Sequence, residues 1–190
     1  MRVWSALPTA SAAAVAATVG TTQLSIDYAP SPTPYQLVPA NSAVTALTVG
    51  GTAVGTLPAG TFAAGGDYTI LVYGTGSPSG APAALVLTDT NQVVANYASV
   101  RLINAAVNGS AGLTMYVAGA EGASSVIYPA AATSTTAYVY TGVKPASAAP
   151  LLLLGAGYTG PQSTAQFTSG SVYTVMVYDA TQAPLITQDR

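Results

Sequence analysis

Hydrophobic positions in this chain fall in short runs rich in Val, Ile, Thr and Tyr, bounded by clusters of Gly, Pro, Asn and Ser. This pattern predicts β-strands separated by turns. The strands are expected at residues 68–73, 84–88, 99–104, 113–119, 136–142 and 172–179. A helix is an alternative to a strand only in the Ala-rich stretch 11–18. Gly20 and the two threonines that follow this stretch favour the end of a strand. Turn signals about every ten residues are typical of a sandwich or barrel.

The strand at residues 172–179 is largely apolar on both faces, whereas an isolated sandwich strand alternates apolar and polar residues. One interpretation is a central strand covered by a loop or by a neighbouring copy of its domain. The other is an outer face that packs on another subunit, where tyrosine is favoured because it is rigid and amphipathic. On the second interpretation, the candidate apolar contact residues are Tyr73, Tyr140 and Tyr178.

An internal repeat organises the chain. Residues 62–73, FAAGGDYTILVY, match residues 167–178, FTSGSVYTVMVY, at an offset of 105 without a gap. Upstream, Arg2 aligns with Arg101 at an offset of 99, which implies a loop that differs in length by six residues. We therefore expect two tandem domains, at residues 1–97 and 98–190, with a longer hairpin loop at 77–82 in the first.

Gly155, Gly157 and Gly160 have the Gly-x-Gly-x-x-Gly spacing of a dinucleotide-binding loop, and they follow four leucines that resemble a buried strand. The aligned positions in the first copy read Gly, Thr and Gly, so the middle glycine is missing there. Pro161 follows at once, and the next strand begins near Phe167, which leaves no room for a crossover helix. We interpret these glycines as turn residues and expect no cofactor.

Composition excludes several classes of function. Half of the residues are hydrophobic, only 5% are charged, and neither His nor Cys occurs. The usual general base, thiolate nucleophiles and the commonest transition-metal ligands are therefore missing, and no loop has the calcium-binding pattern. No basic cluster suggests nucleic acid binding, and no apolar run is long enough to span a membrane. We predict a protein that is not an enzyme and holds no metal.

The N-terminal twenty residues have features of a signal peptide, with Arg2 before a mild apolar run. The alignment of Arg2 with Arg101 instead favours folded structure, so any signal peptide has already been removed. Whether Met1 is the natural mature start is left open. Asn108 lies in an Asn-Gly-Ser glycosylation sequon, although Asn-Gly also favours a turn. Few Lys and Glu residues among many Thr, Gly and Ala favour a location outside the cell.

Residues 100–119, VRLINAAVNGSAGLTMYVAG, resemble the opening of a bacterial secreted repeat, the domain-of-unknown-function 4397 family. The Gly-x-x-Tyr-Thr strands of residues 65–72 and 170–177 resemble a later strand of that repeat. The resemblance covers nearly the whole chain as two copies. It implies secreted, Ig-like β-domains of cell-surface and anchored proteins, and it implies no activity and no functional residues. Thr114 stands where the family usually has Asp.

We therefore expect an all-β protein of two tandem Ig-like antiparallel β-sandwiches, located at a bacterial-type cell surface. The first functional hypothesis is a structural subunit of an extracellular filament or surface layer, with copies of itself as partners and other surface or matrix components as further candidates. Strands near the two ends would pair between subunits. The candidate pairing residues are Val3, Trp4, Leu7, Leu185 and Ile186. The alternative is a monomeric adhesion module that recognises a glycan or protein.

Overall fold

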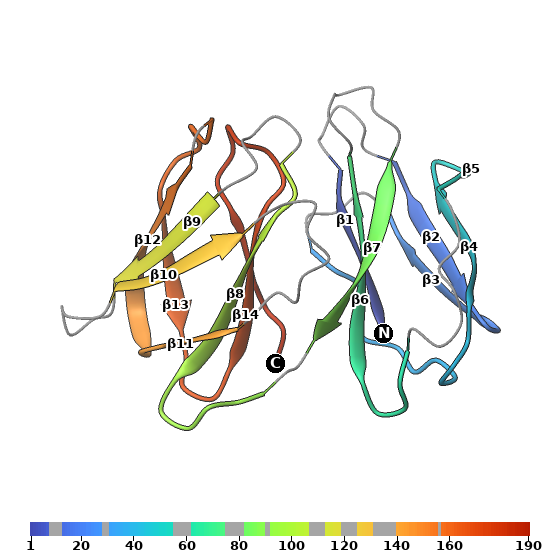
Figure 1. Ribbon diagram of the computed structural model, residues 1–190, viewed down its shortest axis with the longest axis horizontal. Helices are drawn as coiled ribbons and strands as arrows, with labels where there is room; N and C mark the ends of the chain where they lie inside the picture. The colour runs from blue at the N-terminus through green and yellow to red at the C-terminus, as the bar shows by residue number, and fades with distance from the viewer. Residues whose placement is uncertain are drawn as a thin grey trace. The chain divides into compact units, whose positions relative to one another are not determined.

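The computed structural model describes residues 1–7, 13–27, 31–54, 62–74, 82–89, 92–106, 113–118, 125–130, 140–155 and 157–190. Within these ranges the protein is all-β and contains no helix, which confirms the predicted fold class (Figure 1). The chain divides into two compact units, Met1–Thr90 and Asn91–Arg190. The division falls seven residues before the boundary expected from the repeat.

The first unit contains two sheets. One has the strand order β1-β6-β7, with bounds Arg2–Ala6, Asp67–Tyr73 and Ala83–Asp89. The other has the order β3-β2-β4-β5, with bounds Thr22–Ile26, Val15–Val19, Val44–Val49 and Thr52–Ala53. Strand β1 runs parallel to β6, and the other pairs are antiparallel.

The second unit repeats this plan. One sheet has the order β11-β8-β14-β15, with bounds Thr141–Val143, Ala98–Asn104, Val172–Val177 and Leu185–Gln188. The other has the order β10-β9-β12-β13, with bounds Ser125–Ala130, Leu113–Ala118, Ala146–Leu154 and Ser163–Phe167. Strands β8 and β14 are again parallel. The sequence predicted antiparallel sheets and did not anticipate this one parallel pair in each unit.

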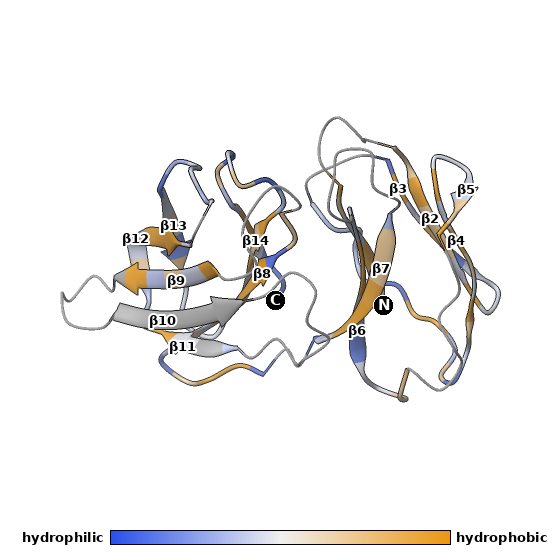
Figure 2. Ribbon diagram, turned by 45° about the horizontal axis from the view of Figure 1, so that its top comes forward, coloured by the Kyte–Doolittle hydropathy of each residue, from blue (hydrophilic) through white to orange (hydrophobic). Residues whose placement is uncertain are grey.

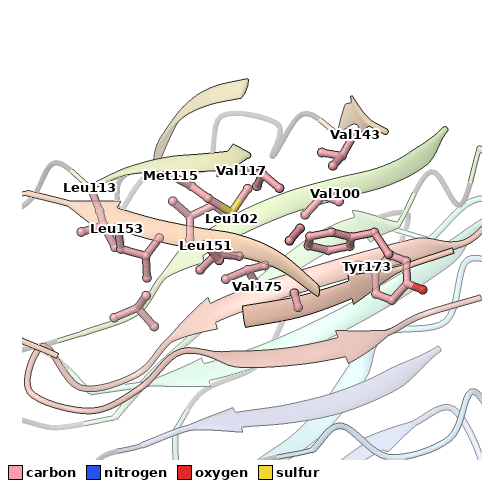
Figure 3. Packing of buried hydrophobic residues seen from close by; sticks show 14 of the residues in the cluster. Val100, Leu102, Leu113, Met115, Val117, Val143, Leu151, Leu153, Tyr173 and Val175 are labelled. Carbon is pink, nitrogen blue, oxygen red and sulfur yellow. The ribbon is translucent and has the colours of Figure 1, made fainter. Parts of the chain in front are cut away.

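Each unit buries one apolar core between its two sheets, as a β-sandwich does. In the second unit, Val100, Leu102 and Val175 from one sheet face Met115 and Leu151 from the other (Figure 3). In the first unit, the corresponding cluster joins strands of both sheets, including Val3, Ile70, Val15 and Leu47. Figure 2 shows hydrophobic residues on strands of both sheets in each unit.

Five of the six predicted strands are confirmed, as β6, β7, β8, β9 and β14. For the sixth, residues 131–139 lie outside the described ranges, and β11 begins only at Thr141. The Ala-rich stretch contains the strand Val15–Val19, so its helical alternative is wrong where it is described. Gly20, at a φ of 59°, opens the two-residue turn to β3, as a type II′ hairpin requires.

The prediction of a buried strand at the four leucines needs a correction. Leu151 and Leu153 are buried in the core, whereas Leu152 is 39% exposed and Leu154 is 48% exposed. Strand β12 pairs with β9 and β13, and only its alternate residues face the core. A uniform leucine run hides this two-residue period, because both faces of the strand carry the same side chain.

The repeat extends to a tyrosine at one end of each core. The hydroxyl of Tyr68 accepts a hydrogen bond from the backbone N–H of Ala63, with a distance of 2.8 Å. Tyr173 accepts the equivalent bond from Thr168 at 3.0 Å. Each ring also meets a phenylalanine edge to face, Phe62 at 5.4 Å and Phe167 at 5.1 Å between ring centroids. These contacts fasten the loop before β6 and before β14 to its own core.

Candidate functional site: a buried polar network in each unit

A polar network crosses all three strands of the sheet β1-β6-β7. The Nε atom of Arg2 donates to the hydroxyl of Thr69 at 2.8 Å, and that hydroxyl donates to Oδ2 of Asp89 at 2.5 Å. Arg2 and Thr69 are direct partners in the parallel register. The hydroxyl of Tyr35 donates to the same Oδ2 at 2.7 Å, and its ring centroid lies 4.6 Å from the Arg2 guanidinium carbon. The ring of Trp4 lies 5.4 Å from that carbon.

The second unit repeats the network with the same residue types. Arg101 Nε donates to the Thr174 hydroxyl at 2.8 Å, and this hydroxyl donates to Asp189 Oδ2 at 2.5 Å. Arg101 and Thr174 are again direct partners in a parallel register. The Tyr140 ring centroid lies 4.9 Å from the Arg101 guanidinium carbon. In each unit a parallel strand pair, an aspartate at or directly after the end of a third strand, and a tyrosine ring therefore converge on one arginine.

Burial decides what these networks can do. The side chains of both aspartates and of Arg101 have no exposed surface, and that of Arg2 is 3% exposed. Such a site offers no access to a substrate, so chemistry on a bound molecule is not its role. A buried charge is costly unless it is paired and hydrogen-bonded, and only one strand register brings these partners together. We therefore interpret each network as a register pin, meaning a set of buried contacts that can form in only one register of the parallel strand pair.

The networks also change the surface. Of the ten charged side chains in the chain, four are buried in the two Arg–Asp pairs. At most six charged side chains remain for the surface of a protein of 190 residues. Two copies of such a molecule can approach each other with little like-charge repulsion. The low charge content of the sequence therefore understates how neutral the exterior is.

The glycine loop between β12 and β13 has no dinucleotide-binding geometry. The two strands it joins pair with each other antiparallel, whereas a dinucleotide-binding loop leads from a strand into a helix. Gly157 has a φ of 84°, and the backbone N–H of Gly160 donates to the carbonyl of Ala180 at 2.8 Å. The Tyr158 hydroxyl donates to the Gln182 carbonyl, and burial raises the pKa of Tyr158 above its ordinary value. The loop packs on a neighbouring turn, as the turn interpretation expects.

Replacing Gly160 by alanine is expected to destabilise the second unit by about 1–3 kcal/mol, because an added Cβ would overpack this turn. That Cβ would lie 2.3 Å from the backbone oxygen of Gln182. Urea unfolding followed by circular dichroism measures the change. Gly142→Ala is the matched control, since its Cβ would lie 3.6 Å from its nearest neighbour, Tyr97. Equal stability of the two variants would contradict the close packing of the loop.

The residues predicted to pair strands between subunits lie in two different settings. Val3, Trp4 and Leu7 are buried. Strand β1 has a partner along each edge, because Val3 exchanges hydrogen bonds with Thr33 on the side away from β6. Pairing of β1 with another subunit would require these bonds to be replaced.

Leu185 and Ile186 lie on β15, which is the last strand of its sheet and pairs with β14 alone among the described residues. Both side chains are half-buried, and Ile186 packs against the core of its own unit. The backbone of β15 therefore lies at an open sheet edge, while the Ile186 side chain packs against the core of its own unit.

The three tyrosines proposed as apolar contacts are all half-buried. Tyr140 covers Arg101 within its own unit, so the structure gives this side chain an internal contact. Tyr73 ends β6, and Tyr178 follows β14 directly. Tyr73 belongs to the first unit, whereas Tyr140 and Tyr178 belong to the second.

Strand β7 is the longest strand at the end of a sheet in the part of the chain that the structure describes. It has seven residues, Ala83–Asp89, and its described pairing is with β6 alone. It carries no charged side chain before Asp89, whose carboxylate is turned into the buried network. Sheet edges in soluble proteins are usually blunted by lysine, proline or a bulge, and β7 has none of these within its bounds.

The described ranges contain no group of three or more acidic side chains placed to hold a metal ion. They also contain no helix with the length and apolar character needed to cross a membrane. The sequon at Asn108 lies outside the described residues.

The fold and the networks define the chain as a protein of two β-sandwich units, each pinned by a buried Arg–Thr–Asp cluster under a tyrosine. In comparisons with known proteins, the chain matches no family model and no curated protein.

Proposed function

We propose that this chain is a non-enzymatic structural subunit that associates with copies of itself into an extracellular filament or surface layer. The observation that carries the proposal is the internal use of charge: both Arg–Asp pairs are buried, so very little charge remains outside to keep copies apart. Association would use backbone pairing at open sheet edges together with apolar burial.

Strand β7 supports a specific mode of association. A strand at a sheet edge has N–H and C=O groups that point away from its sheet, and these can bond to a strand of another molecule. Two copies of β7 can pair antiparallel about a twofold axis, which gives the same contact on both subunits. Because the strand carries no charge from Ala83 to Thr88, such a pairing brings no like charges together.

The resemblance to secreted bacterial β-repeats supports a location outside the cell, and the absence of cysteine is compatible with it. A sandwich whose cores are complete without disulfides can persist there on packing and hydrogen bonding alone. We place the protein at a bacterial-type cell surface on this ground, as part of the same proposal. Two measurements test the location: detection of the protein in the culture medium, and antibody labelling of unpermeabilised cells.

Thr88→Lys is expected to weaken self-association at least tenfold, because a charged side chain at this exposed edge position would have to be carried into the paired interface. Negative-stain microscopy and sedimentation of the purified protein measure the effect. Ser25→Lys is the matched control, since it adds the same charge at an exposed position of another edge strand, β3. If both variants assemble like the unmodified protein, pairing at β7 is wrong.

A further inference from the structure

The first unit carries an open pocket of about 430 Å³ at the end of its core, with a lining that is mostly apolar. Residues that line it include Met1, Val38, Pro39, Phe62, Ala64 and Tyr68. Its floor is the edge-to-face pair of Phe62 and Tyr68, and the Tyr68 hydroxyl already accepts the Ala63 N–H. A cavity of about 150 Å³ lined by apolar side chains is enough to hold benzene, so this one can admit a large aliphatic side chain. We refer to it as the Phe62 pocket.

A leucine stands at the rim of this pocket. Leu37 is 98% exposed, about twice the exposure of the next most exposed large hydrophobic residues among those that the structure describes. Its neighbours are fastened to the unit: the Tyr35 hydroxyl donates to Asp89, and the Gln36 N–H donates to the carbonyl of Met1 at 2.8 Å. The backbone that carries Leu37 is therefore already ordered, so burying this side chain in a partner costs mainly its own rotamer freedom.

We propose that the Phe62 pocket receives Leu37 of a second copy of this chain. A protruding side chain beside a pocket on one surface is self-complementary about a twofold axis, because each copy offers both the side chain and the pocket. Residues 31–40 carry no charge, and Asp67 supplies the one charged side chain among the lining residues. Val38, Pro39 and Phe62 offer apolar contacts to an aliphatic side chain, and Gln36 and Asp67 add polar groups to the lining.

This inference rests on the proposed self-association and adds its second contact. Pairing of β7 about a twofold axis would by itself close a dimer and stop. A subunit with two different twofold contacts, one at β7 and one at the Phe62 pocket, instead links to a partner at each, and it forms an open chain when the two axes do not close a ring. Two contacts are therefore the minimum for a filament built in this way.

The test compares the masses of single and double variants by light scattering after gel filtration. Leu37→Ser is expected to stop assembly at a dimer joined through β7, and Thr88→Lys at a dimer joined through the pocket. The double variant is expected to remain a monomer. Because Leu37 is exposed, its replacement should leave the fold intact, which circular dichroism checks. Leu154→Ser removes another exposed leucine and is the matched control, expected to assemble normally.

A second variant approaches the same contact from the opposite side. Ala64 is exposed and lines the pocket, so Ala64→Trp is expected to fill the pocket and also to stop assembly at a dimer. The Ala64→Trp variant keeps Leu37, and the Leu37→Ser variant keeps an open pocket. When the two are mixed, Leu37 of the Ala64→Trp variant can enter the pocket of the Leu37→Ser variant, which restores one leucine–pocket contact. Larger species should then form than in either protein alone.

The outcomes separate this inference from the proposed function. If Leu37→Ser polymerises like the unmodified protein, or if Leu154→Ser reduces assembly to the same degree, the assignment of the pocket is overturned and the proposed function stands. If the unmodified protein remains a monomer at every concentration, both are overturned.

Discussion

Replacing Asp89 by alanine is expected to destabilise the first unit by about 3–5 kcal/mol, the usual cost of removing one partner from a buried ion pair. Its Oδ2 atom accepts from the hydroxyls of Thr69 and Tyr35 and lies 3.9 Å from Nε of Arg2. The variant would leave the Arg2 guanidinium, whose side chain is only 3% exposed, without its carboxylate. For a domain of this size the melting temperature should fall by more than about 10 °C.

Trp4 makes this measurement specific to the first unit, because it is the only tryptophan and it lies on β1 beside Arg2. Its fluorescence during urea unfolding reports the sheet that contains the network. Asp27→Ala is the matched control: Asp27 is exposed, and its loss should change stability by less than about 0.5 kcal/mol. A loss below about 1 kcal/mol for Asp89→Ala would show that the network does not hold the sheet.

The second large effect concerns Arg101. Arg101→Met alone is expected to cost about 3–5 kcal/mol, since it leaves Asp189 buried without its cation. Arg101→Met combined with Thr174→Val and Asp189→Leu replaces the whole bonded chain by apolar groups of similar size. This triple variant should recover most of the loss, because apolar replacements of a complete buried pair are often neutral or stabilising.

Circular dichroism during urea unfolding measures both variants, and Arg190→Met is the control for loss of an exposed arginine. The comparison separates two roles of the network. If the triple variant regains stability, the charges specify the register and add little net stability. If it is as unstable as Arg101→Met, the network itself supplies stability that packing cannot replace, and our interpretation of it as a register pin is wrong.

The strand pattern and the repeat could be predicted from sequence because each is local or collinear. Strands such as β6 and β14 combine β-branched and aromatic residues between turn signals, and their matched positions identified the repeat. The faces of β12 could not be predicted, because four consecutive leucines have no alternation to show which of them face the core. The parallel pairing of β1 with β6 was also hidden, since about 60 residues separate the two strands.

The network was only partly visible in the sequence. The repeat aligned Arg2 with Arg101 and Thr69 with Thr174, so the sequence alone identified the arginine and the threonine of each network. Asp89 and Tyr35 were missed, since hydrogen bonds join them to partners 20 to 54 positions away along the chain. A signal was nevertheless present: Asp189 stands 100 residues after Asp89, and Tyr140 stands 105 after Tyr35. Applying the repeat to every charged and aromatic residue would have found the set.

The central claim is that a protein with most of its arginines buried associates with itself through apolar and backbone contacts. Static light scattering across a concentration series, at salt from about 0.05 M to about 1 M, tests it most directly, because salt at the upper end screens surface charges over about 3 Å. We expect the mass to rise with concentration and to be as large or larger at high salt. A constant mass of 18.8 kDa under all conditions would contradict the claim.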